Sequence, residues 1–332
     1  MSGMFDPANN PAGVARAGAE VAAGANGMTE PVVDAIALQA GPAGRWRRFA
    51  AQFASSKSAV VGLIVLILCI GAAVFAPWLA PQNPFDLATL DILDAKLPPG
   101  STNYDGSLTY WLGTDGQARD VLSAILYGMR ISLFVGFVSV LSAFVIGTAV
   151  GLVAAYFGGR IDAFFMRIVD MQLSFPSILV ALVLLAMLGK GIDKVIIALI
   201  VVQWAYFARA ARAAAIVERN KEYVEAARCM ALSWHRILWR HVFPNCIPPL
   251  MVIATIDLAH AIALEATLSF LGVGVPVTEP SLGMLISNGF EFLMSGTYWI
   301  CFFPGIALAV VVVAINLVGD HLRDILNPRN EV

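Results

Sequence analysis

The feature that most constrains the fold of this chain is a set of long stretches without a charged residue. Four such runs cover residues 58–85, 131–159, 171–189 and 292–319. Each can supply the roughly 20 residues that a helix needs to cross a bilayer. The mean hydropathy is +0.77 and only 13% of residues are charged, whereas about a quarter are charged in a soluble domain. We therefore expect a membrane protein that crosses the bilayer several times.

Two further apolar stretches, 195–208 and about 247–271, raise the expected number of spans to six. The first is short, but it becomes long enough if Arg209 and Arg212 extend their charged ends to the membrane surface. The predicted fold class is all-α, a polytopic bundle of about six transmembrane helices.

The third span carries two features with structural consequences. Pro176 is expected to kink it, because proline removes one backbone hydrogen bond from a helix. Asp170, near the inner end, is expected to pair with Arg167 or Arg160.

The distribution of basic residues predicts how the spans are oriented. With the N-terminus inside, cytoplasmic segments hold 16 of the 21 Lys and Arg residues, and the outer segments hold five. This asymmetry follows the positive-inside rule and places both termini in the cytoplasm.

The spans divide the chain into five predicted parts. These are a disordered tail and basic juxtamembrane segment (1–57), a first transmembrane helix (58–80), an extracytoplasmic loop (81–127), a core permease domain with five transmembrane helices and an inner loop at 218–245 (128–322), and a cytoplasmic tail (323–332). The tail is rich in Ala, Gly, Pro and Asn and lacks the pattern of a signal peptide.

The inner loop carries the densest cluster of basic and aromatic residues. Residues 218–232 are mostly good helix formers, and Ser233 is placed to cap a second helix from Trp234 to about Val242, which Pro244 would end. Exposed apolar side chains outside the bilayer usually indicate a protein partner or the lipid interface. The loop is therefore a candidate docking surface.

Within this loop, Glu225-Ala226-Ala227, Ala231 and Phe243-Pro244 resemble the EAA loop of ABC-importer permeases. The family pattern has Gly at the position of Ala231, Ile at that of His241 and Leu at that of Phe243. Because the glycine is missing, we expect the turn between the two helices to fall at Leu232-Ser233.

Five other stretches resemble the dipeptide, oligopeptide and nickel branch of that family, and they favour its C-type permease. They are Leu112–Ser123 with Tyr127–Leu133 (Ala118 replacing the usual Gly), Tyr156–Asp162, Met166–Asp170 with Phe175-Pro176, Leu268–Gly274 and Asn316–Asp324. The resemblance implies the MetI-like architecture of a type I importer permease.

The resemblance also implies partners. They are a second homologous permease that completes a heterodimeric pore, two cytoplasmic ATPases, and a periplasmic or lipid-anchored substrate-binding protein, all working in a lipid membrane and without nucleic acid. In the family the EAA loop sits in a groove of the ATPase, which implies a coupling role for Tyr223, Glu225, Ala226, Ala227, Met230, Ala231, Arg236 and Pro244. The alternative is an amphipathic helix on the bilayer surface.

The sequence contains no motor of its own. A phosphate-binding P-loop needs G-x-x-x-x-G-K-[ST], and the chain's one Gly-Lys pair, Gly189-Lys190, is followed by Gly191. We therefore expect a non-catalytic subunit that binds no cofactor, with ATP and Mg²⁺ held by its partners. His235 and His241 are spaced too far round a helix to suggest a metal site.

Three ionisable residues lie within the fifth predicted span, namely Asp257, His260 and Glu265. Charged groups in a membrane are costly and usually face a cavity or a partner. One interpretation is that they line the translocation path and contact the substrate. The other is a hydrogen-bonded contact between helices.

The outer loop holds Asp115, Arg119 and Asp120, which are candidates for contact with the binding protein. The favoured alternative is local. Asp115 would cap a helix that begins near Gln117, and Arg119 would form an ion pair beside it.

Together these features predict the permease subunit of an ATP-driven importer of dipeptides or oligopeptides. Nickel, glutathione or another small solute stays open as the cargo. A secondary transporter is a weaker alternative, because no internal repeat is visible. A membrane scaffold that recruits a soluble partner is another.

Overall fold

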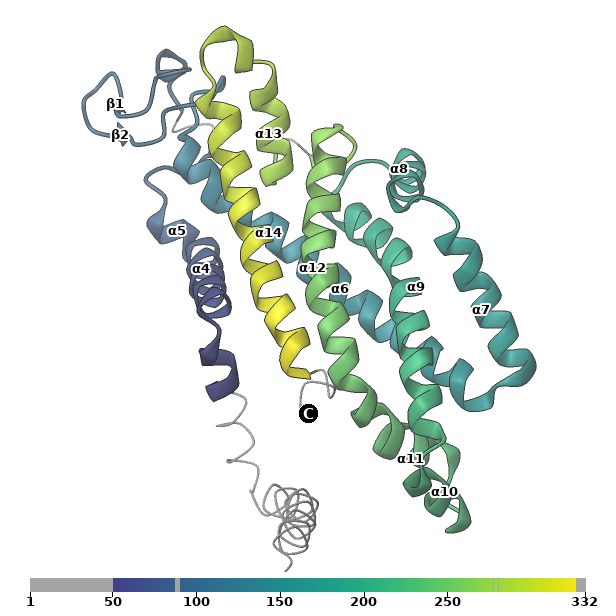
Figure 1. Cartoon of the computed structure of the whole chain (residues 1–332). Coiled ribbons are helices and arrows are strands. Elements are labelled where there is room, and N and C mark those ends of the chain that lie inside the picture. The colour runs from purple at the N-terminus through teal and green to yellow at the C-terminus, as the bar shows by residue number, and fades with distance from the viewer. Residues whose placement is uncertain (1–49, 87–89, 277, 280, 327–332) are drawn as a thin grey trace, which may run out of the picture. The chain divides into compact units, whose positions relative to one another are not determined.

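The computed structural model (Figure 1) describes residues 50–86, 90–276, 278–279 and 281–326. The chain divides into two units, Met1–Ser55 and Ser56–Val332. Residues 50–55 of the first unit are helical, and the rest of the predicted tail lies outside the described residues. The fold below is that of the second unit.

Five helices of the described chain are long and apolar enough to cross a membrane. They are α4 (Lys57–Val74), α6 (Val121–Phe157), α9 (Ile192–Arg219), α12 (Phe243–Phe270) and α14 (Trp299–Leu326). Each overlaps most of one of the predicted apolar runs. α6 begins ten residues before its charge-free run, which starts after Arg130. Arg130 is exposed, so the helix includes it without burying its charge.

The candidate for a sixth span is a broken pair of helices. α7 (Gly159–Leu173) and α8 (Ser177–Leu188) pass the same test together but meet at 88°. Pro176 ends the break as the residue before α8. The expected kink is thus a complete interruption, because proline also disfavours the helical conformation of the residue before it.

The orientation of α7 follows from ion pairs with α9. Arg209 donates to Asp170 and Arg212 donates to both oxygens of Asp162. The expected pairing of Asp170 with Arg167 or Arg160 is wrong. The two α9 arginines lie across from the α7 carboxylates, and this contact spans 39 to 50 residues of sequence.

The centre of the bundle is the contact between α6 and α9. A Cβ atom at Gly147 would lie 2.3 Å from the Trp204 carbonyl oxygen, and one at Gly151 would lie 2.3 Å from that of Ala208. The two glycines therefore allow a backbone approach that a side chain would prevent. α12 and α14 pack beside this pair, and α4 packs against α14 (Figure 1).

The extracytoplasmic parts are small. α5 (Ala76–Leu79) and η3 (Ile92–Asp94) lead to a hairpin in which β1 (Ser101–Thr102) pairs antiparallel with β2 (Thr109–Tyr110). This hairpin is an addition to the predicted all-α fold. Between α12 and α14 lie the short helices α13 (Leu282–Phe290) and η5 (Leu293–Ser295).

Candidate functional site

The predicted coupling loop folds as a short helical hairpin at the end of α9. It consists of α10 (Glu222–Cys229), α11 (Trp234–Ile237) and a π-helical stretch η4 (Leu238–Val242) that continues into α12. Its apolar side chains pack on α6 and α9 in one buried cluster: Leu152, Ala155, Ala211, Ala215, Val224, Ala227, Ile237, Leu238 and Val242. The hairpin is thus packed into the bundle through these side chains.

The predicted end of the second helix is wrong. Pro244 lies near the start of α12, directly after the π-helical stretch η4, and the helix continues through it. The chain therefore passes from α11 through η4 into α12 as helix throughout. Ser233 does precede α11 in an extended conformation, but its side chain makes no capping hydrogen bond.

The remaining face of the hairpin is exposed. Of the eight predicted coupling residues, Ala227 is buried, and the other seven are exposed: Tyr223, Glu225, Ala226, Met230, Ala231, Arg236 and Pro244. Met230 is the most exposed apolar side chain of the group at 67%. The hairpin therefore offers a mixed apolar and charged surface, and its contact with an ATPase stays a prediction.

Tyr223 fastens the two ends of the hairpin together. Its hydroxyl donates to Glu218 Oε2 at 2.7 Å and accepts from Asn245 Nδ2 at 3.2 Å. Burial of the hydroxyl, with the bond to Glu218, raises the pKa of Tyr223 to about 12. The ring edge of this tyrosine faces solvent while its hydroxyl joins the end of α9 to the start of α12.

The turn between α10 and α11 lies at Ala231. This residue has a φ of 55°, a left-handed conformation that alanine rarely adopts. The Leu232 N–H donates to the Ala227 carbonyl at 3.3 Å, which is the closing bond of a helix C-cap. The expected shift of the turn to Leu232-Ser233 is therefore wrong. The turn therefore lies at the position where the family has glycine. Ala118 also replaces a family glycine, and it too has a left-handed conformation, with a φ of 62°.

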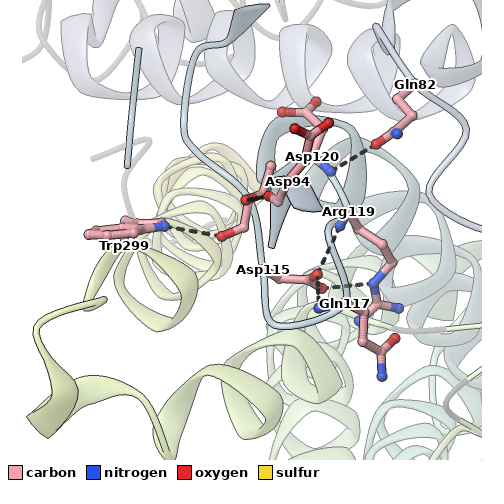
Figure 2. Close-up of polar contacts among 8 residues, drawn as sticks. Gln82, Asp94, Asp115, Gln117, Arg119, Asp120 and Trp299 are labelled. Atoms are coloured by element: carbon pink, nitrogen blue, oxygen red, sulfur yellow. Dashed lines mark hydrogen bonds and ion pairs between the residues drawn. The ribbon is translucent and has the colours of Figure 1, made fainter. Parts of the chain in front are cut away.

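The extracytoplasmic segment is organised round Asp94. Its carboxylate accepts from the Tyr104 N–H and from the Tyr110 hydroxyl, both at 3.0 Å. Burial and the neighbouring Asp94 raise the pKa of Tyr110. Thr114 donates to the Asp94 carbonyl, and Trp299 Nε1 of α14 donates to the Thr114 carbonyl at 3.2 Å (Figure 2). These bonds fix the hairpin to the membrane helices.

Asp115 and Arg119 form a buried ion pair in the same segment (Figure 2). The two residues are 6% and 4% exposed, and Arg119 Nε lies 2.7 Å from Asp115 Oδ2. Asp115 Oδ1 also accepts from the backbone N–H of Gln117 and of Arg119, at 2.8 and 2.9 Å. The pair thus closes a tight loop, and its side chains face the protein interior.

The residue that caps the following helix is Asp120. α6 begins at Val121, and Asp120 Oδ2 accepts from the Ser123 N–H at 2.8 Å, so the expected cap by Asp115 of a helix near Gln117 is wrong. Burial raises the pKa of the Asp120 carboxyl, although its bonds with Ser123 oppose this shift. All three outer-loop candidates have internal partners, and their contact with a binding protein stays a prediction that this geometry does not favour.

The three ionisable residues of α12 do not form one surface. His260 is exposed, Asp257 is partly buried and Glu265 is fully buried. Ser132 of α6 donates to Glu265 Oε2 at 2.9 Å, and Ser269 donates to Oε1 at 2.7 Å. The contacts of Glu265 are therefore those of the helix–helix alternative. A path-lining role for Asp257 and His260 stays a prediction.

Gln203 is a polar residue that the sequence analysis overlooked. It lies in the middle of α9, is 1% exposed, and its Nε2 donates to the Asp257 carbonyl oxygen at 3.5 Å. Asp257 Oδ2 and Gln203 Oε1 have no hydrogen-bond partner in this structure. The signal for Gln203 was available, since an amide amid an apolar run is itself unusual.

Comparisons with known proteins decide the family. Residues 147–332 match the family described as the binding-protein-dependent transport system inner membrane component, and residues 44–99 match the N-terminal transmembrane domain of oligopeptide transport permease C. The chain belongs to this permease family. It is accordingly a multi-pass protein of the inner membrane.

Relatives cover most of the permease. The dipeptide transport system permease protein DppC of Escherichia coli K12 is 41% identical over 277 residues, which is 83% of this chain and 91% of that protein. A putative peptide transport system permease of Brucella suis is 41% identical over 82% of this chain and 88% of its own length. DppC of Alkalihalophilus pseudofirmus is 37% identical over 86% and 90%.

The fold also resembles a solved transporter. An inward-facing structure of the MetNI methionine ABC transporter aligns with a TM-score of 0.51 and 22% identity, covering 61% of this permease and 96% of that chain. At this identity the likeness concerns the fold alone. It agrees with the MetI-like architecture implied by the sequence.

Proposed function

We propose that this permease forms half of the pore of an ABC importer for dipeptides or short oligopeptides. The other half is a second, homologous permease, and two cytoplasmic ATPases bind ATP and Mg²⁺ and drive the cycle. A periplasmic or lipid-anchored binding protein delivers the peptide. The peptide substrate is supported by the names of the relatives, which are dipeptide and peptide permeases.

The observation that carries the proposal is the construction of the coupling hairpin. Its inner side chains are buried against α6 and α9, so a force applied to the hairpin reaches the membrane helices without an intervening flexible joint. Its outer side chains, including Met230 and Arg236, are free to contact another protein. The basic residues would favour the encounter and its specificity more than its affinity.

The chain itself performs no catalysis in this scheme. Its contribution is to present alternating access to the two sides of the membrane while the ATPases hydrolyse ATP. The continuous helical connection from α11 through η4 into α12 links the hairpin to the helix that carries Asp257 and His260.

The proposal is tested by reconstituting the permease in proteoliposomes with its second permease, its binding protein and its ATPases. We expect ATP-dependent accumulation of a labelled dipeptide. Met230→Asp should abolish accumulation and weaken co-purification of the ATPases, because it places a charge in the apolar part of the exposed face. Cys229→Ser, a neighbouring exposed change, is the matched control.

Two results would contradict the proposal. One is accumulation of Ni²⁺ or glutathione without any accumulation of dipeptides, which would change the cargo. The other is normal ATPase co-purification and uptake in Met230→Asp, which would remove the hairpin from the coupling pathway.

A further inference from the structure

The connection between α12 and α13 is built around a buried carboxylate. Glu265 is 0% exposed and lies in α12 near its outer end. Two serine hydroxyls donate to it, Ser132 at 2.9 Å and Ser269 at 2.7 Å, and Ser281 lies beside it. We call these four residues the Glu265 cluster. They come from α6, α12 and the residue that caps α13.

The two donating hydroxyls are each used twice. The Ser132 oxygen also accepts from the Leu282 N–H at 3.2 Å, and the Ser269 oxygen accepts from the Val275 N–H at 3.4 Å. The carboxylate is therefore linked through hydroxyls to backbone amides at the start of α13 and in the turn after α12, while the Ser281 oxygen caps α13 by accepting from the Met284 N–H at 3.4 Å. A negative group suits this position because the N-terminus of a helix carries a partial positive charge.

Close backbone packing keeps α13 in this place. A Cβ atom at Gly283 would lie 2.3 Å from the Ala266 carbonyl oxygen of α12, and one at Gly128 would lie 3.3 Å from the Leu282 nitrogen of α13. Ser287 of α13 also donates to the Phe270 carbonyl at 2.7 Å. Sliding α13 against α6 or α12 would thus break the hydrogen bonds and disturb tight packing together.

We propose that Glu265 is a positioning residue that holds α13 on α6 and α12, so that the three helices move as one body during transport. The physical reason is the cost of separation. Pulling α13 away would break the bonds from the Leu282 N–H to Ser132 and from Ser287 to the Phe270 carbonyl, and it would leave these groups without partners in a water-poor interior. The inference rests on the proposed transport function, and it assigns Glu265 a task other than contact with the substrate.

The first test compares variants of the cluster in the reconstituted complex. We expect Glu265→Ala to lower the rate of peptide uptake by about tenfold, because the hydroxyls lose their common acceptor. Glu265→Gln keeps one acceptor oxygen and should retain more uptake than Glu265→Ala. Glu279→Gln removes an exposed carboxylate from the same connection and should transport like the unmodified protein.

The decisive test replaces the cluster with a covalent link. Phe270 at the end of α12 and Phe290 at the end of α13 have ring centroids 5.6 Å apart. In a background whose native cysteines are replaced, Phe270→Cys with Phe290→Cys can be joined by a short bifunctional thiol reagent. Cross-linking should leave uptake intact when Glu265 is present, and it should restore at least half of the uptake lost in Glu265→Ala.

The outcomes separate the possibilities. Loss of uptake on cross-linking the Glu265 protein would overturn the proposal, since α13 would then have to leave α12. If the cross-link does not restore uptake in an assembled Glu265→Ala complex, the proposal is also overturned. That result would favour a direct contact between Glu265 and the substrate. If Glu265→Ala does not assemble, the same rescue is measured on Ser132→Ala with Ser269→Ala, which keeps the carboxylate. Absence of uptake by the unmodified complex would instead count against the proposed function.

Discussion

Replacing Asp115 with Ala should destabilise the extracytoplasmic segment strongly. Asp115 and Arg119 are 6% and 4% exposed, so the change leaves a guanidinium buried without its partner. It also leaves the backbone N–H groups of Gln117 and Arg119 without their acceptor. Breaking a buried ion pair in this way costs about 3–5 kcal/mol, and each orphaned N–H adds to that cost.

Two related variants separate the cost of the lost charge from the cost of the lost hydrogen bonds. Asp115→Asn retains an oxygen for the two backbone N–H groups and loses the charge, so its cost should be smaller, about 1–3 kcal/mol. Asp115→Ala combined with Arg119→Met removes both charges. It should be more stable than Asp115→Ala alone, because no charge remains buried and unpaired.

The assay is unfolding of the purified permease in nanodiscs, followed by pulse proteolysis of the extracytoplasmic segment. Binding-protein affinity is measured on the same samples below the unfolding transition. The reasoning is refuted if Asp115→Ala unfolds like the unmodified protein while its affinity for the binding protein falls. That result would show that Asp115 and Arg119 contact the binding protein and do not stabilise the loop.

Two further predictions concern backbone geometry. Ala231→Gly should stabilise the hairpin by about 0.5–1 kcal/mol, because it relieves a left-handed alanine at some cost in unfolded-chain entropy; Ala226→Gly, in the adjacent helix, should instead destabilise it by about 1 kcal/mol. Hydrogen exchange of the α10 amides measures both, and equal signs would contradict the argument. Gly151→Ala should separate α6 from α9 and cost about 1–3 kcal/mol, whereas Gly305→Ala, which lies within α14 and meets nothing within 4 Å, should keep or raise the Tm.

The membrane spans could be predicted because the bilayer imposes a rule that each segment obeys by itself. A charge-free run of sufficient length must form a helix in hydrocarbon, where no water satisfies its backbone. Most of the run at 292–319 accordingly lies in α14, and the helical hairpin stands at the end of α9 where the basic loop predicted it. Pro176 also indicated a kink in the third span, though not a complete break.

Polar partners could not be predicted in the same way, because they are brought together from distant parts of the chain. Glu265 meets Ser132 across 133 residues, and Asp170 meets Arg209 across 39. A sequence motif cannot show which of several nearby opposite charges lies on the facing helix. For Asp170 the nearest ones in sequence were the wrong choice.

The sequence by itself determined which segments are apolar enough to enter the membrane, and it predicts how they are oriented and where a cytoplasmic partner attaches. These follow from local hydrophobicity and charge. Only the tertiary structure decided that Asp115 and Arg119 face inward, that Ala231 adopts a left-handed turn, and that Glu265 joins three helices. Burial and hydrogen bonding depend on which backbones approach closely, and that is set by packing between helices far apart in the chain.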